Sequence, residues 1–367
     1  MKKDNFFKRN WLVMLCGLLV GAAAVILTQL GNPQNMGFCI ACFLRDIAGS
    51  LQLHQAPPVQ YFRPEIIGLI IGACIIAFIG KEFKPRGGSS PFTRFILGAV
   101  VMMGALVFLG CPLRMVIRIG GGDLNAIVGL VGFMVGILIG IVFLKGGFSL
   151  GRTHKQSMLE GLAFPVVMAG LFVLSLMSSF FFKTTADATK PGGQQAVWYV
   201  ALGIALVVGI LAQRSRLCMV GGLRDAVMFK EFSLLAGFGG ILIAVLVGNA
   251  ILGNLNWGFV DQKVSHNDGL WNFLGMAVVG WGSVLLGGCP LRQLVLAGEG
   301  NTDSALTVFG MIGGAALSHT WRIAGNAGNV GPESSAGAND RTMIAMIGCF
   351  IILLLVSLFN MKKEGKK

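Results

Sequence analysis

The sequence predicts an all-α polytopic membrane protein of about ten transmembrane helices, in two inverted five-helix repeats with short re-entrant half-helices. An apolar composition, ten long apolar runs and two duplicated motifs support this fold class. Of the 367 residues, 54% are hydrophobic and only 12% are charged, and the mean hydropathy is +0.76. Soluble proteins carry about 25% charged residues. The composition therefore indicates a protein that is embedded in the lipid bilayer.

Ten apolar runs are long enough to cross a membrane, which takes about 20 residues in a helix. They cover residues 11–30, 64–80, 92–110, 125–145, 158–182, 196–213, 232–253, 270–288, 303–320 and 342–360. Four shorter and more polar stretches lie between them, at residues 36–54, 111–124, 215–230 and 289–301. Because these four are too polar to span the membrane, we expect them to form the half-helices.

The net charge of +13 at pH 7 indicates how the chain is oriented. Lys and Arg gather in cytoplasmic loops of membrane proteins, which accounts for the charge without a nucleic-acid partner. Placing the N-terminus inside puts most of the 29 Lys and Arg on the cytoplasmic side. The charge pattern therefore predicts a multi-pass membrane protein with both termini in the cytoplasm.

Two motifs occur twice. The pentapeptide Gly-Cys-Pro-Leu-Arg ends at Arg114 and again at Arg292, 178 residues later. A second signature starts at Cys39 and runs into Leu44-Arg45-Asp46, and it recurs from Cys218 into Leu223-Arg224-Asp225 at an offset of 179. Two signatures at nearly the same offset indicate an internal duplication of about 178 residues.

The duplication predicts the architecture. The two repeats would cover residues 1–182 and 183–367 of one membrane domain. Five spans in each repeat is an odd number, so the second repeat must enter the membrane from the opposite side. Inverted repeats with interrupted helices are typical of secondary transporters, whose substrate sites lie between the repeats. We therefore expect an hourglass of two funnels that meet at a waist.

Cys111 and Cys289 are the strongest candidates for a substrate pathway. Each follows an apolar run and precedes Pro, a residue best tolerated in the first turn of a helix. The motif thus predicts a new short helix with Cys as its cap, which places a thiol at the positive helix end and suits a soft or anionic guest. We expect these two thiols to lie near one another at the waist, with Cys39 and Cys218 on the same pathway.

Arginines support this site. Arg114 and Arg292 would anchor at the interface, hold the short helices against backbone carbonyls, or supply positive potential for an anion. Arg118 continues the face of Arg114, and its counterpart is Leu296, which predicts that the outer funnel attracts anions more strongly. The remaining two arginines adjoin acidic residues and are expected to form structural clamps, Arg45 with Asp46 and Arg224 with Asp225.

Two other functions remain open. Cys39 and Cys42 form a Cys-x-x-Cys pair, which would suit a membrane thiol-disulfide oxidoreductase. Thiolates would also suit a soft-metal permease, although the four His share no spacing typical of a metal site. We expect a transporter rather than an enzyme, without a cofactor or a resident metal.

The two duplicated cysteine motifs, together with Arg216-Leu217-Cys218, resemble the YeeE/YedE family of sulfur-transport membrane proteins, in particular its YedE-like branch associated with selenium metabolism. The resemblance implies an hourglass-shaped inner-membrane protein whose relatives take up thiosulfate through transient S–H hydrogen bonds. It places Cys39 at the outer entrance and Cys111 and Cys289 at the waist, with Cys218 as the fourth element. It also implies a separate cytoplasmic sulfur carrier of the TusA/SirA type. A selenium compound, thiosulfate or another reduced sulfur species is the implied substrate.

Overall fold

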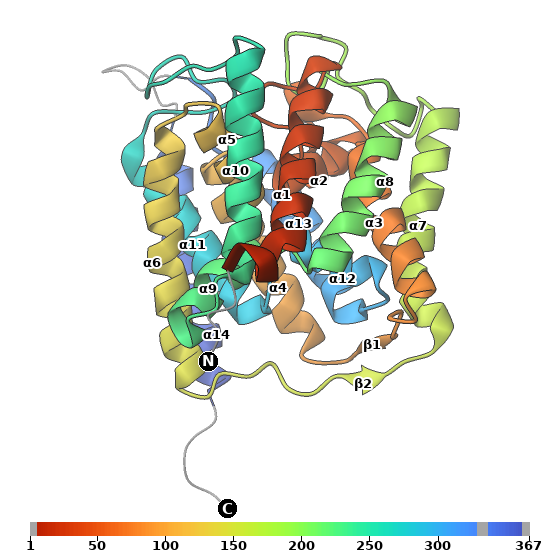
Figure 1. Ribbon diagram of the computed structural model, residues 1–367, viewed down its shortest axis with the longest axis vertical. Coiled ribbons are helices and arrows are strands. Elements are labelled where there is room, and N and C mark those ends of the chain that lie inside the picture. The colour runs from red at the N-terminus through yellow and green to blue at the C-terminus, as the bar shows by residue number, and fades with distance from the viewer. Residues whose placement is uncertain (1–5, 329–336, 362–367) are drawn as a thin grey trace, which may run out of the picture.

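The computed structural model describes residues 6–328 and 337–361 and is almost entirely helical over these ranges (Figure 1). Its ten longer helices are α1 (Phe6–Gln29), α3 (Pro64–Ile79), α4 (Pro91–Val107), α6 (Asn125–Lys145), α7 (Met158–Met177), α8 (Trp198–Ser215), α10 (Ser233–Ile251), α11 (Gly269–Leu286), α13 (Thr302–Thr320) and α14 (Asp340–Phe359). Four short helices lie between them: α2 (Ile40–Ser50), α5 (Pro112–Gly120), α9 (Met219–Phe229) and α12 (Pro290–Gly298). A 3₁₀ turn, η1 (Pro57–Val59), precedes α3.

Nine helical segments in the described ranges are long and apolar enough to cross a membrane. Three of these segments run through a short break, joining α4 to α5, α8 to α9, and α11 to α12. The predicted run at residues 303–320 forms α13. Polar residues in its first and last turns lower its mean hydropathy, so it is not one of the nine candidate spans. The prediction of an all-α polytopic membrane protein is confirmed.

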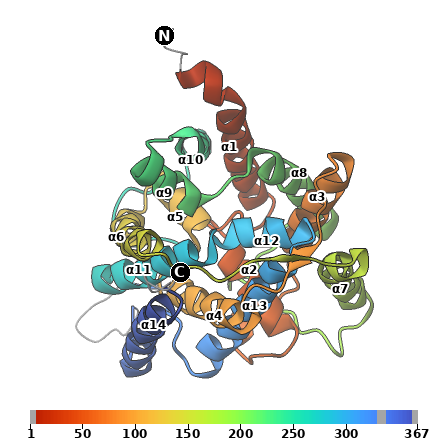
Figure 2. The same cartoon turned by 90° about the horizontal axis from the view of Figure 1, so that it is seen from below.

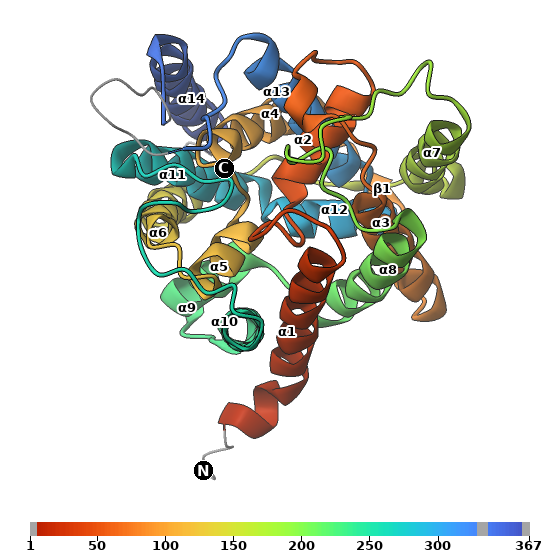
Figure 3. The ribbon, with the colours of Figure 1, turned by 90° about the horizontal axis from the view of Figure 1, so that it is seen from above.

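The packing partners of the helices repeat between the two halves. α6 packs against α11 as α13 packs against α4, and α3 packs against α8 as α10 packs against α1. The short helices reach into the other half, because α5 packs against α10 and α12 packs against α3. In Figures 2 and 3 the short helices α2, α5 and α12 lie toward the middle, whereas α9 lies nearer the edge beside α10. The two halves are therefore interlocked rather than placed side by side.

Glycines explain why two of these crossings are so close. A Cβ at Gly132 or Gly136 of α6 would overlap the carbonyl oxygen of Phe273 or Ala277 of α11. The same residues recur 178 positions away in the crossing of α13 with α4, where Gly310 and Gly314 meet the carbonyl oxygens of Phe95 and Ala99. Small residues let membrane helices approach closely. The sequence duplication is thus also a duplication of contacts.

α7 and α14 depart from this pattern. α7 packs against α3 and α12, whereas α14 packs against α4 and α11. In Figure 2 the two helices lie at separate edges of the molecule. The last helix of each half therefore has different neighbours, which the repeated motifs do not predict.

Contacts between loops define two faces. On the lower face of Figure 1, strand β1 (Arg86–Gly87) pairs with β2 (His154–Lys155), and Phe148 bridges to Met361 after α14. On the upper face, Asp123 bridges to Gly258 and His266 to Gly328. α2 and α5 lie in the upper half, and α9 and α12 lie in the lower half (Figure 1).

Candidate functional site

All four motif cysteines stand at the N-cap of a short helix. The Cys39 sulfur accepts a hydrogen bond from the Cys42 N–H at 3.3 Å at the start of α2. The Cys218 sulfur accepts one from the Gly221 N–H at 3.3 Å at the start of α9. Cys111 and Cys289 cap α5 and α12 and are each followed by Pro at the first position. This confirms the helix starts predicted from Cys-Pro, whereas the caps of α2 and α9 lack such a signal because no Pro follows.

The four thiols form two pairs. The Cys39 thiol lies beside that of Cys111, with the Cys42 thiol next to it, and the Cys218 thiol lies beside that of Cys289. These pairs form because α2 packs against α4, which ends where α5 begins, and α9 packs against α11, which ends where α12 begins. Each Cys-Pro thiol therefore meets a thiol of its own half, and a contact of Cys111 with Cys289 is not among those of the described residues.

Backbone N–H groups surround the Cys-Pro thiols. The N–H groups of Arg114 on its own helix and Ala41 on α2 lie near the Cys111 sulfur, which closes no cap hydrogen bond. The Cys289 sulfur has the corresponding neighbours, Arg292 on its own helix and Met219 on α9, and it closes no cap hydrogen bond either. Free N–H groups of the first helical turn carry partial positive charge. Each thiol pair thus lies between the positive ends of two short helices.

Arg114 places a positive charge beside the upper thiols. The side chain is fully buried, and its guanidinium donates to the carbonyl oxygens of Asn35 at 3.0 Å and Val264 at 2.9 Å, and to that of Leu109. Its Nη1 also lies 3.6 Å from the Cys42 sulfur. Among the described residues, its partners include no carboxylate. The Arg114 guanidinium therefore binds backbone carbonyl oxygens, and its positive charge is not neutralised by a carboxylate.

Arg118 is paired. Its Nε lies 2.7 Å from Asp123 Oδ2, and its other nitrogens donate to the Phe108 carbonyl at 2.9 Å and to Ser265 Oγ at 2.5 Å. The guanidinium also lies 4.2 Å above the Phe108 ring. The excess positive charge in the upper half, which we predicted from Arg118, therefore comes from Arg114 instead.

In the lower half, Arg292 occupies the position of Arg114 in the motif but has different side-chain partners. Arg292 Nη1 forms an ion pair with Glu299 at 3.0 Å. Gln293 Nε2 donates to the Leu286 carbonyl at 3.0 Å, and Leu286 corresponds to Phe108 in the first half. Gln293 thus replaces Arg118 as the donor to this carbonyl. A hollow of about 240 Å³ opens beside Arg292 on the lower face, and its lining includes Lys84, Arg86, Arg216, Glu82 and Glu299.

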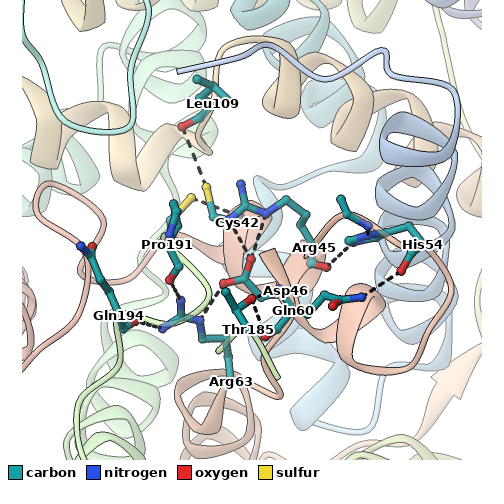
Figure 4. A network of polar contacts seen from close by, with 12 residues as sticks. Cys42, Arg45, Asp46, His54, Gln60, Arg63, Leu109, Thr185, Pro191 and Gln194 are labelled. Carbon is teal, nitrogen blue, oxygen red and sulfur yellow. Dashed lines mark hydrogen bonds and ion pairs between the residues drawn. The ribbon is translucent and has the colours of Figure 1, made fainter. Parts of the chain in front are cut away.

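A charged cluster lies on and beside α2 (Figure 4). Asp46 receives Arg45 Nη2 at 2.7 Å and Arg63 Nε at 2.7 Å, and all three side chains are buried. Arg63 also donates to the carbonyls of Pro191 and Gln194. The Arg45–Asp46 clamp is as predicted, but sequence reasoning missed Arg63. The signal was available, since Arg63-Pro64-Glu65 places two charges at the head of an apolar run.

The corresponding pair in the second half is more open. Arg224 Nε lies 2.8 Å from Asp225 Oδ1, and about a quarter of each side chain is exposed. The clamp is again as predicted, but no third charged partner is described for it. The two halves therefore share a motif and differ in burial.

The described cysteines are all free thiols, including Cys42, whose thiol faces the Leu109 carbonyl at 3.9 Å. Cys16 and Cys349 are buried within apolar helices, and Cys74 is partly buried. Within the described ranges, no group of three or more His, Cys, Asp and Glu residues is placed to hold a metal ion.

These features define a multi-pass helical membrane protein with a thiol-lined polar site inside the membrane domain. The chain belongs to the sulphur transport family, whose model matches residues 2–111 and 214–366. All four motif cysteines lie within these two segments. The family that the duplicated cysteine motifs indicated is therefore confirmed.

The chain is also similar to the thiosulfate transporter TsuA of Escherichia coli (strain K12). The two are 30% identical over 104 residues, which is 28% of this chain. The match spans 29% of the length of that relative.

Proposed function

We propose that the protein carries a small sulfur-containing anion such as thiosulfate across the cytoplasmic membrane, relayed between its two thiol pairs. The observation that carries this proposal is the convergence of two short-helix N-termini on each pair, Cys39 with Cys111 and Cys218 with Cys289. The pairs lie on helices of opposite halves of the molecule (Figure 1). Membership of the sulphur transport family supports the substrate class.

The residues suit such an anion chemically. Thiosulfate presents a soft sulfur and charged oxygens, and S–H and N–H groups are both donors to it. A relay of weak donors binds the anion firmly enough to enter and weakly enough to leave. Buried Arg114 adds positive potential beside the upper pair. No covalent bond forms or breaks in this relay. A selenium compound such as selenosulfate has the same pattern of soft atom and oxyanion.

The loop charges indicate which face of the molecule lies in the cytoplasm. Lys84, Arg86, Arg152 and Lys155 lie in the loops of the lower face, which we therefore assign to the cytoplasm. The chain ends would then be cytoplasmic as well, although residues 1–5 and 362–367 lie outside the described residues. We retain the inverted repeats of residues 1–182 and 183–367 as part of this proposal, and the exchange of helix partners between the halves supports it.

The lower hollow supports a cytoplasmic acceptor. Lys84, Arg86 and Arg216 line it beside the Arg292–Glu299 pair, so it favours an anion leaving the pathway or an acidic protein surface. A separate sulfur carrier of the TusA/SirA type would collect the anion at this face.

Uptake by proteoliposomes tests the proposal against the oxidoreductase alternative. Labelled thiosulfate, selenite and selenosulfate are compared side by side, with Cys42→Ser as the discriminating variant. We expect thiosulfate uptake that selenosulfate inhibits and that Cys42→Ser lowers only modestly, since a serine hydroxyl still donates a hydrogen bond at this position. If none of the anions enters while Cys39 and Cys42 cycle with an electron acceptor, the transporter proposal is wrong.

A further inference from the structure

The first turn of α3 holds a carboxylate that the anion relay does not use. Glu65 is 1% exposed, and its Oε1 accepts a hydrogen bond from Asn32 Nδ2 at 2.6 Å. Its Oε2 has no hydrogen-bond partner among the described residues. Burying a charged oxygen without a donor is costly, and acidic groups within membrane domains generally mark ion or proton pathways.

The charged groups that face Glu65 form a small closed set. Arg63 is two residues earlier, Asp46 faces it from α2, and Tyr61 approaches from the loop before α3. Asp46 is in turn bound by both Arg63 and Arg45. The set thus contains two guanidinium groups and two carboxyl groups. It is neutral when Glu65 is ionised and carries one positive charge when Glu65 is protonated.

An open hollow reaches the residues that hold this set in place. Asn32 lines a hollow of about 590 Å³, together with Pro191 and Gln194, whose carbonyls hold Arg63. The Asn32 Oδ1 accepts from the Ala196 N–H at 2.9 Å, which fixes its amide with the donor side toward Glu65. The Asn32 amide therefore separates the hollow from the carboxyl group, and a proton entering from the upper solution passes this amide to reach Glu65.

The same set acts on the upper thiols through α2. Arg45 and Asp46 lie on α2 (Figure 4), the helix that Cys39 caps and that carries Cys42 one turn before Arg45. A positive charge gained by the set raises the electrostatic potential at the upper thiol pair, because charges in a poorly solvated interior are weakly screened. Protonation of the carboxyl group thus favours an anion at that pair.

We propose that Glu65 is a proton-binding site that couples proton uptake from the outer solution to anion binding at the Cys39–Cys111 pair. The step is Glu65–COO⁻ plus H⁺ giving Glu65–COOH, with no other bond made or broken. Coupling between two sites is reciprocal, so anion binding also draws a proton onto Glu65. The proton site stands on the contacts above, whereas its coupling to an anion rests on the proposed function.

Infrared difference spectroscopy on the purified full chain, titrated with acid in the absence of anion, tests the site itself. We expect a carboxyl C=O band that grows as pH falls and is missing in Glu65→Gln. The exposed carboxylate of Glu160 provides a matched control, and Glu160→Gln should keep the band. If Glu65→Gln fails to fold, Asn32→Leu removes the only described donor to Glu65 and should change the pH at which the band titrates. A band unchanged in every variant overturns the proposal.

Thiosulfate binding measured over the same pH range tests the coupling. In the unmodified protein the affinity should rise as pH falls, by at most about tenfold per pH unit for one linked proton. Glu65→Gln, which imitates the protonated carboxyl, should bind with one affinity throughout. A pH profile that survives in Glu65→Gln refutes the coupling. If the band is lost in Glu65→Gln while thiosulfate binds neither protein, the proton site stands and the proposed substrate is wrong.

Discussion

At the scale of residues, Arg114 and Arg292 occupy the same place in a repeated motif and have different partners. Arg114 is held by carbonyl oxygens and a thiol, whereas Arg292 is neutralised by Glu299. A buried cation without a carboxylate has a high affinity for anions, because it lacks full solvation. We therefore expect the upper thiol pair to be the stronger anion site and the lower pair the weaker one.

This asymmetry predicts how uptake depends on substrate concentration. Arg114→Gln should raise the half-saturating thiosulfate concentration by about tenfold or more, the effect of losing about 1.4 kcal/mol of binding. Arg292→Gln should raise it less, since Glu299 already offsets that charge. The concentration dependence of uptake by proteoliposomes checks both variants. Equal effects in the two would contradict the asymmetry.

Arg118 and Asp123 form a buried pair that predicts a large loss of stability. Arg118→Leu installs the residue type of the second half and leaves the Asp123 carboxylate without its cation, at a cost of about 3–5 kcal/mol. The double variant with Asp123→Asn should recover part of that loss. Denaturant unfolding of the purified protein measures the free energies.

The Arg224–Asp225 pair of the second half is more exposed to solvent, and it serves as the control for the Arg118 and Asp123 variants. Arg224→Leu should cost less than about 1 kcal/mol, because pairs open to solvent contribute little. If Arg118→Leu destabilises the protein no more than Arg224→Leu does, the buried pair does not have the role given to it.

Residue types could be predicted at the site more readily than their partners. The four cysteines were found because two motifs repeat. Arg63 and Glu65 were missed because the motifs do not include them. The carbonyls that hold Arg114 come from Asn35 and Val264, far away in the chain. Any residue type supplies a backbone carbonyl, so the sequence carries no signal for such a contact.

At the scale of elements, helix starts were the most predictable features and pairings of short helices the least. Cys-Pro predicted the starts of α5 and α12, since Pro favours the first helical turn. The apposition of α2 with α5 depends instead on how α2 packs against α4. A local pattern cannot report that packing. The sequence therefore contained no sign that Cys111 lies beside Cys39, and the expected approach of Cys111 to Cys289 stays a prediction.

The close helix crossings predict which glycines tolerate a side chain. Gly136→Val should destabilise the protein by about 1–3 kcal/mol or prevent folding, because the new atoms overlap the α11 backbone. Gly314→Val should do the same against α4. Gly203 of α8 has no atom within 4 Å of an added Cβ, so Gly203→Val is the control and should be well tolerated.

Yield of folded protein and thermal unfolding in detergent measure these effects. If Gly136→Val and Gly203→Val behave alike, backbone approach does not determine the crossing of α6 with α11.

At the scale of the whole molecule, the main helix contacts repeat as the sequence does, but the contacts of α7 and α14 do not. Those two helices lie outside the repeated motifs, and their different neighbours follow from the edges left open by the rest of the bundle. The ten longer helices and the four short ones could be predicted because apolar runs and their breaks are local properties.

The opposed thiol pairs predict reactivity from opposite sides. In variants that keep one motif cysteine, a small membrane-impermeant thiol reagent should modify Cys39 from outside and Cys218 from inside. The control is Cys349, which lies within apolar α14 and belongs to neither thiol pair, and it should resist both. Modification of Cys39 and Cys218 from the same face would contradict the inverted arrangement.

The central claim is that paired thiols pass a sulfur anion through the membrane, and uptake of labelled thiosulfate by proteoliposomes tests it most directly. Cys111→Ala and Cys289→Ala each remove one partner of a pair, and Cys74→Ala removes a thiol of α3 that belongs to neither pair. We predict that the first two variants lose uptake while folding normally and that Cys74→Ala retains it. Uptake that persists in Cys111→Ala and Cys289→Ala would contradict the account.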